Sequence, residues 1–192
     1  AHEVLRFDSP RLLHARVWRS WLPSPAHVAT LPTMTIYDTP NPDYAARVLD
    51  SFSRQPFMSH VGAGITLLEA GAVDVAVSHA PHLTQQHGFF HGGLIGAVAD
   101  NAGAYAAFTL APSDFSILTV EFKVSFLSPA TGESLLARGR VVKPGRTLVV
   151  SRADVFAVSD GQEKLVATAL VTLMLLEGRD DAPTAAPALD PA

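Results

Sequence analysis

The residues best suited to chemistry lie in one stretch of the chain, from Gln85 to Asp100. A His-Gly-Gly triplet at 91–93 opens a long run of small apolar residues, a pattern typical of a buried helix. The first N–H groups of a helix are unpaired and carry a partial positive charge, so they can polarise a carbonyl group. Asp100 lies further along the same run and supplies a carboxylate. These groups could stabilise a carbonyl oxygen that gains negative charge and activate water against its carbon.

Asp100 is difficult to explain by packing alone. It lies among Val98, Ala99, Gly103 and Ala104, with no Lys or Arg within one helical turn. A partly desolvated carboxyl group has a raised pKa and could take a proton from water, or it could attack directly and form a mixed anhydride. The alternative is a hydrogen bond at a dimer interface or within the helix. The sequence does not choose between base and nucleophile.

The composition narrows the class of protein. A chain of 192 residues is long enough for one domain with a core, and a net charge of -4 without a long Lys/Arg run argues against nucleic-acid binding. The absence of cysteine excludes disulfides and thiolate catalysis, and it fits a cytoplasmic location. Residues 94–111 are the most apolar stretch, but Asp100 and Asn101 at its middle favour a buried helix over a membrane span.

The two ends of the chain differ in composition from the middle. Residues 1–33 contain both tryptophans and four arginines without strand alternation, so we treat them as an extension that is flexible, or upstream of a natural start at Met34. Residues 34–177 form the predicted domain. Residues 178–192 are rich in Pro, Ala and Asp, which predicts a disordered tail.

The domain reads as a helix, two strands, a long helix and four strands. Short turns between the strands predict antiparallel neighbours, and the sum is an α+β fold with about six strands curled around a central helix. Glycines within that helix predict that the sheet packs very closely against it. The expected helices are 43–54 and 91–110, and the expected strands are 64–69, 72–79, 116–127, 134–142, 147–158 and 165–176.

Several motifs together resemble the PaaI-like hotdog-fold acyl-CoA thioesterases. They are the triplet at 91–93, Asp100, the Thr-Val-Glu-Phe strand opening at 119–122 and the Ser-Pro-Ala ending at 128–130. The resemblance covers roughly residues 43–176 and implies an enzyme that hydrolyses acyl-CoA to free acid and coenzyme A, without a cofactor. It also implies a homodimer or a dimer of dimers.

The resemblance also implies roles for individual residues. Gly92 would supply the polarising N–H, Asp100 the carboxylate, Gln85 a side-chain amide and Thr119 a hydroxyl near the water. Many family members carry Asn in place of Gln85, so the amide here sits on a longer arm. His91 is left open between orienting substrate and a structural bond at the helix start. Alternation places Thr119 on the polar face of its strand, with Glu121 and Ser125.

The spacing of His91 and Asp100 has a geometric consequence. Nine residues of α-helix rise by ~13.5 Å, so one subunit cannot bring both ends to one carbonyl group. If both act on one thioester, the acid must come from a second subunit across a two-fold axis.

Further residues are expected to contact the substrate. Large aromatic side chains, including Phe52 and Phe57, would favour aryl or medium-chain acyl groups, and cations would meet the phosphates of coenzyme A. The expected binding residues are Gly93, Phe89, Phe90, Lys143 and Arg146. The loop histidines His79, His82 and His87 lack the spacing of a metal site.

Two rival functions remain open from the sequence. One is a hotdog-fold acyl-CoA hydratase or dehydratase, and the other is a non-catalytic acyl-CoA-binding module. A serine hydrolase is set aside because the chain has no Gly-x-Ser-x-Gly motif.

Overall fold

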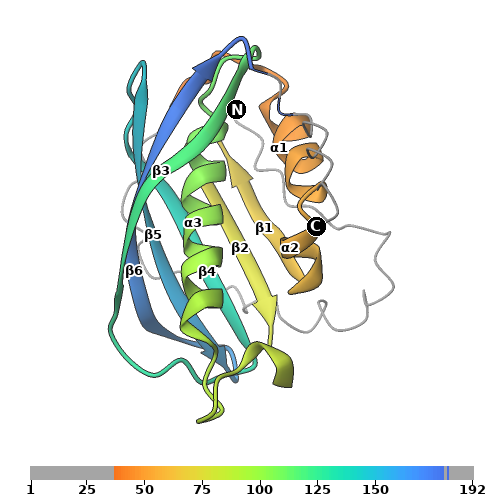
Figure 1. Ribbon diagram of the computed structural model, residues 1–192, viewed down its shortest axis with the longest axis vertical. Coiled ribbons are helices and arrows are strands. Elements are labelled where there is room, and N and C mark those ends of the chain that lie inside the picture. Colours follow the sequence, from red (N-terminus) through yellow and green to blue (C-terminus); the bar gives the residue numbers. More distant parts are fainter. Residues whose placement is uncertain (1–36, 180, 182–192) are drawn as a thin grey trace, which may run out of the picture.

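The sheet and the central helix have the predicted arrangement. The computed structural model describes residues 37–179 and 181, so the predicted N-terminal extension and most of the predicted tail lie outside the described residues. One six-stranded antiparallel sheet curls around one long helix (Figure 1). The predicted α+β hotdog fold is therefore confirmed.

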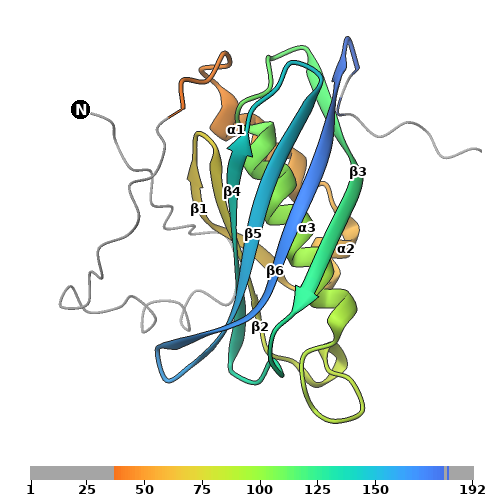
Figure 2. The same ribbon diagram turned by 90° about the vertical axis from the view of Figure 1, so that its left-hand side faces the viewer.

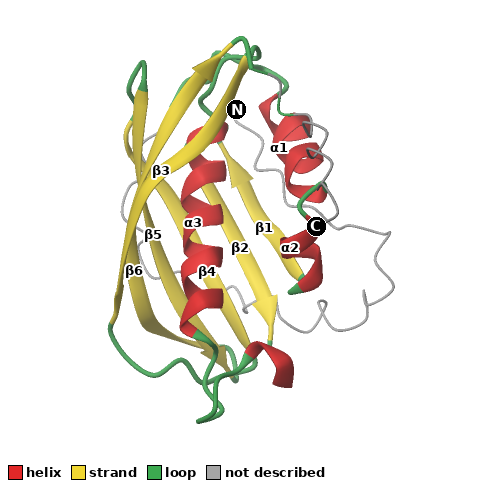
Figure 3. Cartoon of the chain, viewed as in Figure 1, coloured by secondary structure: helices red, strands yellow, loops and turns green. Residues whose placement is uncertain are grey.

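The elements follow the predicted order, with two short additions. Two helices, α1 and α2, lie beside the β1 edge (Figure 3). The helices are α1 (Tyr44–Ser53), α2 (Pro56–His60) and α3 (Gly92–Phe108), with a 3-10 turn η3 (Pro81–Leu83). The strands are β1 (Ala63–Glu69), β2 (Ala72–Ser78), β3 (Phe115–Phe126), β4 (Ser134–Lys143), β5 (Leu148–Ser159) and β6 (Gln162–Glu177). Pro56 ends the first helix as expected, but it also begins α2, because the first helical position needs no N–H donor.

The sheet order is β1-β2-β4-β5-β6-β3, so β1 and β3 are its edges. Helix α3 lies in the hollow of this sheet and contacts all six strands (Figure 2). Two glycines show how close the contact is. A Cβ atom at Gly139 of β4 would lie 2.0 Å from the carbonyl oxygen of Ala102, and one at Gly103 would lie 2.9 Å from the side chain of Val171.

Substituting Gly139 with alanine is expected to be strongly destabilising. The added methyl group meets the backbone of α3 at Ala102, which cannot move aside as a side chain can. We expect a loss of about 3 kcal/mol or more in the free energy of unfolding, measured by urea titration. Gly64→Ala on β1 is the matched control, because a Cβ atom there meets nothing within 4 Å. Equal stability of the two variants would contradict the proposed contact.

The predicted burial of the central helix on all sides is wrong along one stripe. Ala97, Asp100, Asn101 and Ala104 are each only half-buried. Their spacing of three or four residues places them on one face of α3. This face lies between α1 and β3, where a pocket separates the two elements. A carboxylate on this face therefore remains accessible to a ligand.

Strand β2 is buried more completely than alternation predicted. Val73, Val75 and Val77 belong to the core, as expected, but Asp74 is also only 8% exposed. Its carboxylate accepts a hydrogen bond from Arg140 and lies 3.8 Å from the guanidinium of Arg138. The long arginine side chains of the neighbouring strand β4 pair with this carboxylate on the face away from α3.

Strand β3 contains a bulge that changes which face each residue occupies. Thr119 pairs with Leu173 and Glu121 with Thr172, so Val120 is the extra residue. Thr119 thus points toward α3 on the same face as Phe122. Its predicted placement with Glu121 is wrong, because period-two alternation does not continue through a bulge.

Candidate functional site

The start of α3 leaves the N–H groups of Gly92 and Leu94 without an acceptor among the described residues. His91 is the residue that caps this helix, and its Nδ1 accepts the N–H of Gly93 at 2.9 Å. Among the described residues, no partner accepts the N–H of Gly92. The contact favours the structural role of His91. It also occupies the N–H of Gly93, so Gly92 and the buried Leu94 keep unpaired N–H groups, and Gly92 is the more accessible donor.

The Gln85 loop is fastened to this helix start. The N–H of Gln85 donates to the carbonyl of Phe89 at 2.8 Å, and the N–H of His91 donates to the carbonyl of Leu83 at 2.9 Å. The side-chain oxygen of Gln85 accepts the N–H of His87, so the amide folds onto its own loop. Gln85 therefore lies in the loop that leads to Gly92, with its side-chain oxygen bonded within that loop.

Asp100 occupies the middle of α3 and is held by one neutral donor. The hydroxyl of Thr119 donates to its Oδ1 at 2.9 Å, and the bulge in β3 is what turns Thr119 toward it. Among the described residues, no Lys or Arg forms an ion pair with this carboxylate. Burial raises the pKa of Asp100, while the bond from Thr119 acts in the opposite direction. A weakly solvated carboxylate of this kind is a stronger base than an exposed one.

Asp100 and Thr119 open into a pocket of about 200 Å³. Its walls come from α1, α3 and β3. The lining residues besides these two are Ser51, Gln55, Asn101, Ala104, Tyr105, Phe108, Ile117, Leu118 and Asp181.

The two groups predicted to act on one carbonyl are far apart within the subunit. Gly92 and Asp100 belong to one unbroken helix. Eight residues of rise separate their backbones by ~12 Å along the axis. A single chain therefore presents the donor and the carboxylate at separate places, as the sequence spacing predicted.

A polar network forms one wall of the pocket, and sequence reasoning missed it. The Nε2 of Gln55 donates to the Oδ1 of Asn101 and to the hydroxyl of Tyr105, both at 2.8 Å. The hydroxyls of Tyr105 and Ser51 lie 3.0 Å apart. The sequence did contain one sign of this network. Asn101 and Tyr105 are four residues apart on α3, which places both beside Asp100.

The predicted binding residues do not gather at this pocket. Phe89 is half-buried beside His87, and Phe90 is buried in the core against His79. Neither lines the cavity that contains Asp100, where the aromatic residues are Tyr105 and Phe108 instead.

The two predicted cations also lie elsewhere. Lys143 ends β4 and is exposed, and Arg146 lies in the following turn. Arg146 lines a second cavity, of about 320 Å³, together with Leu110 and Phe115 near the C-terminal end of α3. Within one subunit these cations are therefore not neighbours of Gly92.

The two other aromatic candidates differ in their surroundings. Phe52 packs edge-on against Tyr105, with ring centres 5.5 Å apart, and so supports the pocket wall from behind. Phe57 of α2 is exposed.

The loop histidines point to different neighbours. His79 packs on Phe90, His87 on Phe89, and His82 lies beside His60 with ring centres 6.2 Å apart. In the part of the chain that the structure describes, no three His, Asp or Glu side chains gather in an arrangement that could hold a metal ion.

Known proteins share both the sequence pattern and the fold. The family model named thioesterase superfamily matches residues 87–164, which include α3, Asp100 and β3. A protein of Saccharolobus solfataricus, assigned to the esterases by name, is 31% identical over 127 residues, covering 66% of this chain and 82% of its own. The chain belongs to the thioesterase superfamily.

Solved structures agree with that assignment. A thioesterase family protein from Silicibacter pomeroyi is 50% identical, covers 70% of this chain and 99% of its own, and superposes with a TM-score of 0.69. The PaaI protein of E. coli, from the phenylacetic acid degradation operon, shares the fold at 20% identity, with a TM-score of 0.64 and coverage of 71% and 95%. The resemblance to PaaI-like hotdog thioesterases is thus confirmed, and it supports thioester hydrolysis as the general activity. No helix among the described residues is long and apolar enough to cross a membrane.

Proposed function

We propose that this protein is an acyl-CoA thioesterase that releases a free acid and coenzyme A. The observation that carries the proposal is Asp100, a half-buried carboxylate that faces a pocket on the central helix and forms no ion pair with any described Lys or Arg. A thioester carbonyl needs a donor for its oxygen and an attacking oxygen for its carbon. The chain offers a free N–H at Gly92 for the first task and the carboxylate for the second.

Gly92 suits the task of stabilising the developing negative charge. Its N–H lies at the first position of α3, where the helix dipole adds a partial positive charge. Because glycine has no side chain, the thioester oxygen can approach this N–H closely. Removing one such donor from an acyl-transfer enzyme typically lowers kcat by a factor of about 10²–10³.

Asp100 would act on the carbon atom by one of two routes. As a base it takes a proton from water, and the resulting hydroxide adds to the carbonyl carbon. As a nucleophile its own oxygen adds to the carbon, and water then hydrolyses the anhydride. Either way the C–S bond breaks, the sulfur leaves as coenzyme A after gaining a proton, and the acid is freed.

The two groups would meet across a pair of subunits. Edge strand β3 supports this arrangement because it carries large exposed apolar residues, with Leu118 at 61% and Phe126 at 56% exposure. An exposed apolar edge of this length invites pairing with another strand. Antiparallel pairing of two β3 strands about a two-fold axis would set Gly92 of one subunit opposite Asp100 of the other.

Four of the predicted binding residues also have proposed roles in this assembly. Gly93, beside Gly92, would keep the approach to the donor open, and Phe89 would lie at the rim of the partner's pocket. Lys143 and Arg146 would contact phosphate groups of coenzyme A, since both lie at the exposed turn between β4 and β5.

A thiol-release assay tests the proposed function. Aryl, short, medium and long acyl-CoAs are offered, and free thiol is measured with a chromogenic disulfide. Crotonyl-CoA is assayed in parallel for loss of its double bond. Thiol release without hydration supports the thioesterase. Hydration without thiol release favours the hydratase, and binding without either reaction favours a non-catalytic module.

Replacing Thr119 with valine is expected to shift the pH dependence of the reaction. The hydroxyl of Thr119 lowers the pKa of Asp100 against the larger raising effect of burial, so its loss raises that pKa further. Because the reaction needs ionised Asp100, the acid limb of the kcat/KM profile moves to higher pH. Profiles of wild type and Thr119→Val across the acid range measure the shift. An unchanged acid limb would mean that another group controls it.

A further inference from the structure

The pocket has a defined length along the central helix. Its α3 residues run from Asp100 to Phe108, with Tyr105 between them. These eight residues of rise span ~12 Å. The cavity, of about 200 Å³, is smaller than the ~300–1,000 Å³ of most small-molecule pockets. An acyl group whose carbonyl lies at Asp100 would therefore extend toward Tyr105 and Phe108.

The wall on the α1 side is rigid. Ser51 is buried and bonded to Tyr105, and Gln55 bridges Tyr105 and Asn101. Buried side chains with satisfied hydrogen bonds resist displacement, since moving one leaves its partner unpaired. A longer acyl chain cannot gain room by pushing this wall aside.

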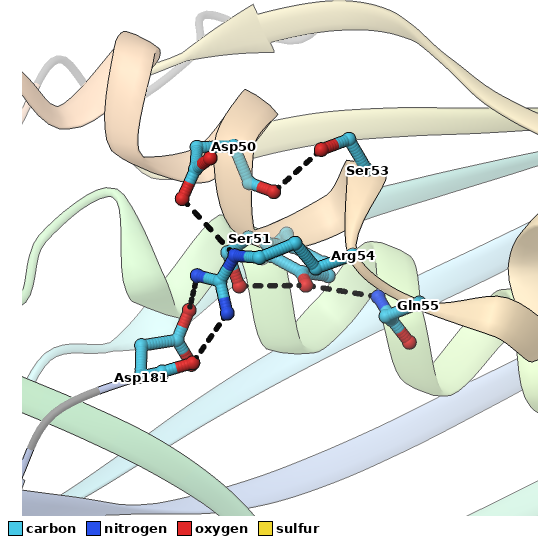
Figure 4. Close-up of polar contacts among 7 residues, drawn as sticks. Asp50, Ser51, Ser53, Arg54, Gln55 and Asp181 are labelled. Atoms are coloured by element: carbon cyan, nitrogen blue, oxygen red, sulfur yellow. Dashed lines mark hydrogen bonds and ion pairs between the residues drawn. The ribbon is translucent and has the colours of Figure 1, made fainter. Parts of the chain in front are cut away.

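Asp181, beyond the end of β6, also lines the pocket. Its backbone oxygen accepts from Nη1 of Arg54 at 2.6 Å, and its Oδ2 accepts from Nη2 at 2.9 Å. Figure 4 shows the Arg54 guanidinium between the carboxylates of Asp50 and Asp181. Burial raises the pKa of Tyr105, and the Asp181 carboxylate adds to the effect, as expected of a neighbour on the same cavity.

We propose that the contact between Arg54 and Asp181 sets the upper length of the acyl group that this thioesterase accepts. The inference rests on the proposed function and adds a specificity determinant outside the catalytic groups. Arg54 comes from the end of α1, and Asp181 lies 127 residues further along the chain. Their pairing closes the space between α1 and the β3 side, next to Tyr105.

The contact is weak, so a long acyl chain can displace it at a small cost that a short chain does not bear. Both side chains are partly exposed, at 33% and 26%, and such ion pairs are weak and screened by salt. A long acyl chain would have to displace Asp181, whereas a short chain would not. Loss of the pair should thus change the relative use of long and short substrates. Because a pair of this kind contributes little, the expected change is a few-fold, which a ratio of two kcat/KM values can still resolve.

The test is the ratio of kcat/KM for decanoyl-CoA to that for butyryl-CoA. We expect Asp181→Ala and Arg54→Ala each to raise this ratio by about 2- to 5-fold, the range set by a partly exposed ion pair. Arg54→Lys keeps a cation and should recover part of the wild-type ratio. Asp50→Ala is the matched control, because it removes the other ion pair of Arg54 but does not line the pocket. The control should keep the wild-type ratio.

A binding measurement keeps this proposal separate from the proposed function. Thermal shifts with S-butyl- and S-decyl-CoA, which are thioethers and cannot be hydrolysed, report pocket length without turnover. We expect Asp181→Ala to gain stabilisation from the S-decyl compound and wild type to gain little. If wild type releases no thiol from any acyl-CoA, the proposed function fails while this measurement still tests the pocket. An unchanged preference in both assays would overturn the proposed role of Arg54 and Asp181.

Discussion

Replacing Asp100 with asparagine is expected to lower kcat for thioester hydrolysis by about 10²–10⁴-fold. Asparagine has nearly the same shape, and its side-chain oxygen can still accept the hydroxyl of Thr119, as Asp100 does at 2.9 Å. It cannot take a proton from water or form an anhydride. The packing of the pocket is kept, and the loss falls on the chemical step. Thiol release at saturating acyl-CoA measures it.

Asp74→Asn is the matched control for this experiment. Asp74 is also a buried aspartate whose pKa is raised, chiefly by burial, but it pairs with Arg140 on the face of the sheet away from α3. Its substitution tests whether loss of any buried carboxylate is enough to reduce turnover. We expect full kcat from Asp74→Asn. Comparable losses in both variants would point to a general effect on folding and would remove the case for Asp100.

The Asp100→Asn substitution should also stabilise the fold at neutral pH. Burial raises the pKa of Asp100, so the folded chain holds this proton more tightly than the unfolded chain does. Stability contributed by protonated Asp100 is complete below the unfolded pKa and is lost as the pH rises through the folded pKa. At neutral pH the folded chain bears the cost of a partly buried, ionised carboxylate, and asparagine, which is uncharged, avoids that cost. The melting temperature of Asp100→Asn should exceed that of wild type at neutral pH, and the difference should shrink in acid.

Replacing Gly92 with proline should remove the proposed carbonyl donor with little change to the helix. Proline has no N–H, and it is well tolerated at the first position of a helix. His91 precedes it with φ −64° and ψ 135°, an extended conformation compatible with a following proline. We expect kcat to fall by about 10²–10³-fold. Steady-state thiol release measures the loss.

Gly92→Ala is the matched control for the proline variant. Alanine keeps the N–H, and it places a Cβ atom at the same position, 3.3 Å from the ring of Phe126. The ring of Phe126 needs to move by only a few tenths of an ångström to accept this atom. The alanine variant should keep far more activity than the proline variant. Equal losses would show that space near Phe126, rather than the N–H of Gly92, matters.

Combining the two variants tests whether the site is shared between subunits. Gly92→Pro and Asp100→Asn chains are co-expressed with different affinity tags, and the mixed dimer is isolated. One of its two sites then contains an intact Gly92 from one chain and an intact Asp100 from the other. We expect about half of the wild-type activity to return, because a two-fold dimer has two equivalent sites. A mixed dimer as inactive as its parents would exclude the shared site.

The sequence was sufficient for the architecture because local patterns and global packing agree here. Strand alternation, turn residues and the run of small residues around Asp100 each depend on near neighbours in the chain. Gly139 and Gly103 show the same consistency, since the glycines lie where sheet and helix approach most closely. The spacing of Gly92 and Asp100 was also readable, because a continuous helix converts sequence separation directly into distance.

The environment of Asp100 depended on information that no local pattern contains. The bulge at Val120 turns Thr119 toward Asp100, and a single extra residue in one strand leaves no mark in an alternating sequence. Gln55 reaches the pocket because α2 starts at Pro56, where only an end to the first helix was predicted.

The sequence by itself determined the hotdog fold and the helix that presents Gly92 and Asp100, and it predicts that two subunits are needed to unite these residues. Only the tertiary structure decided which side chains surround the carboxylate and where the pocket ends. Arg54 and Asp181 are 127 residues apart and meet only because α1 and the end of β6 converge beside Tyr105. Such contacts arise from the path of the whole chain, because residues distant in sequence become neighbours only when the sheet has closed around α3.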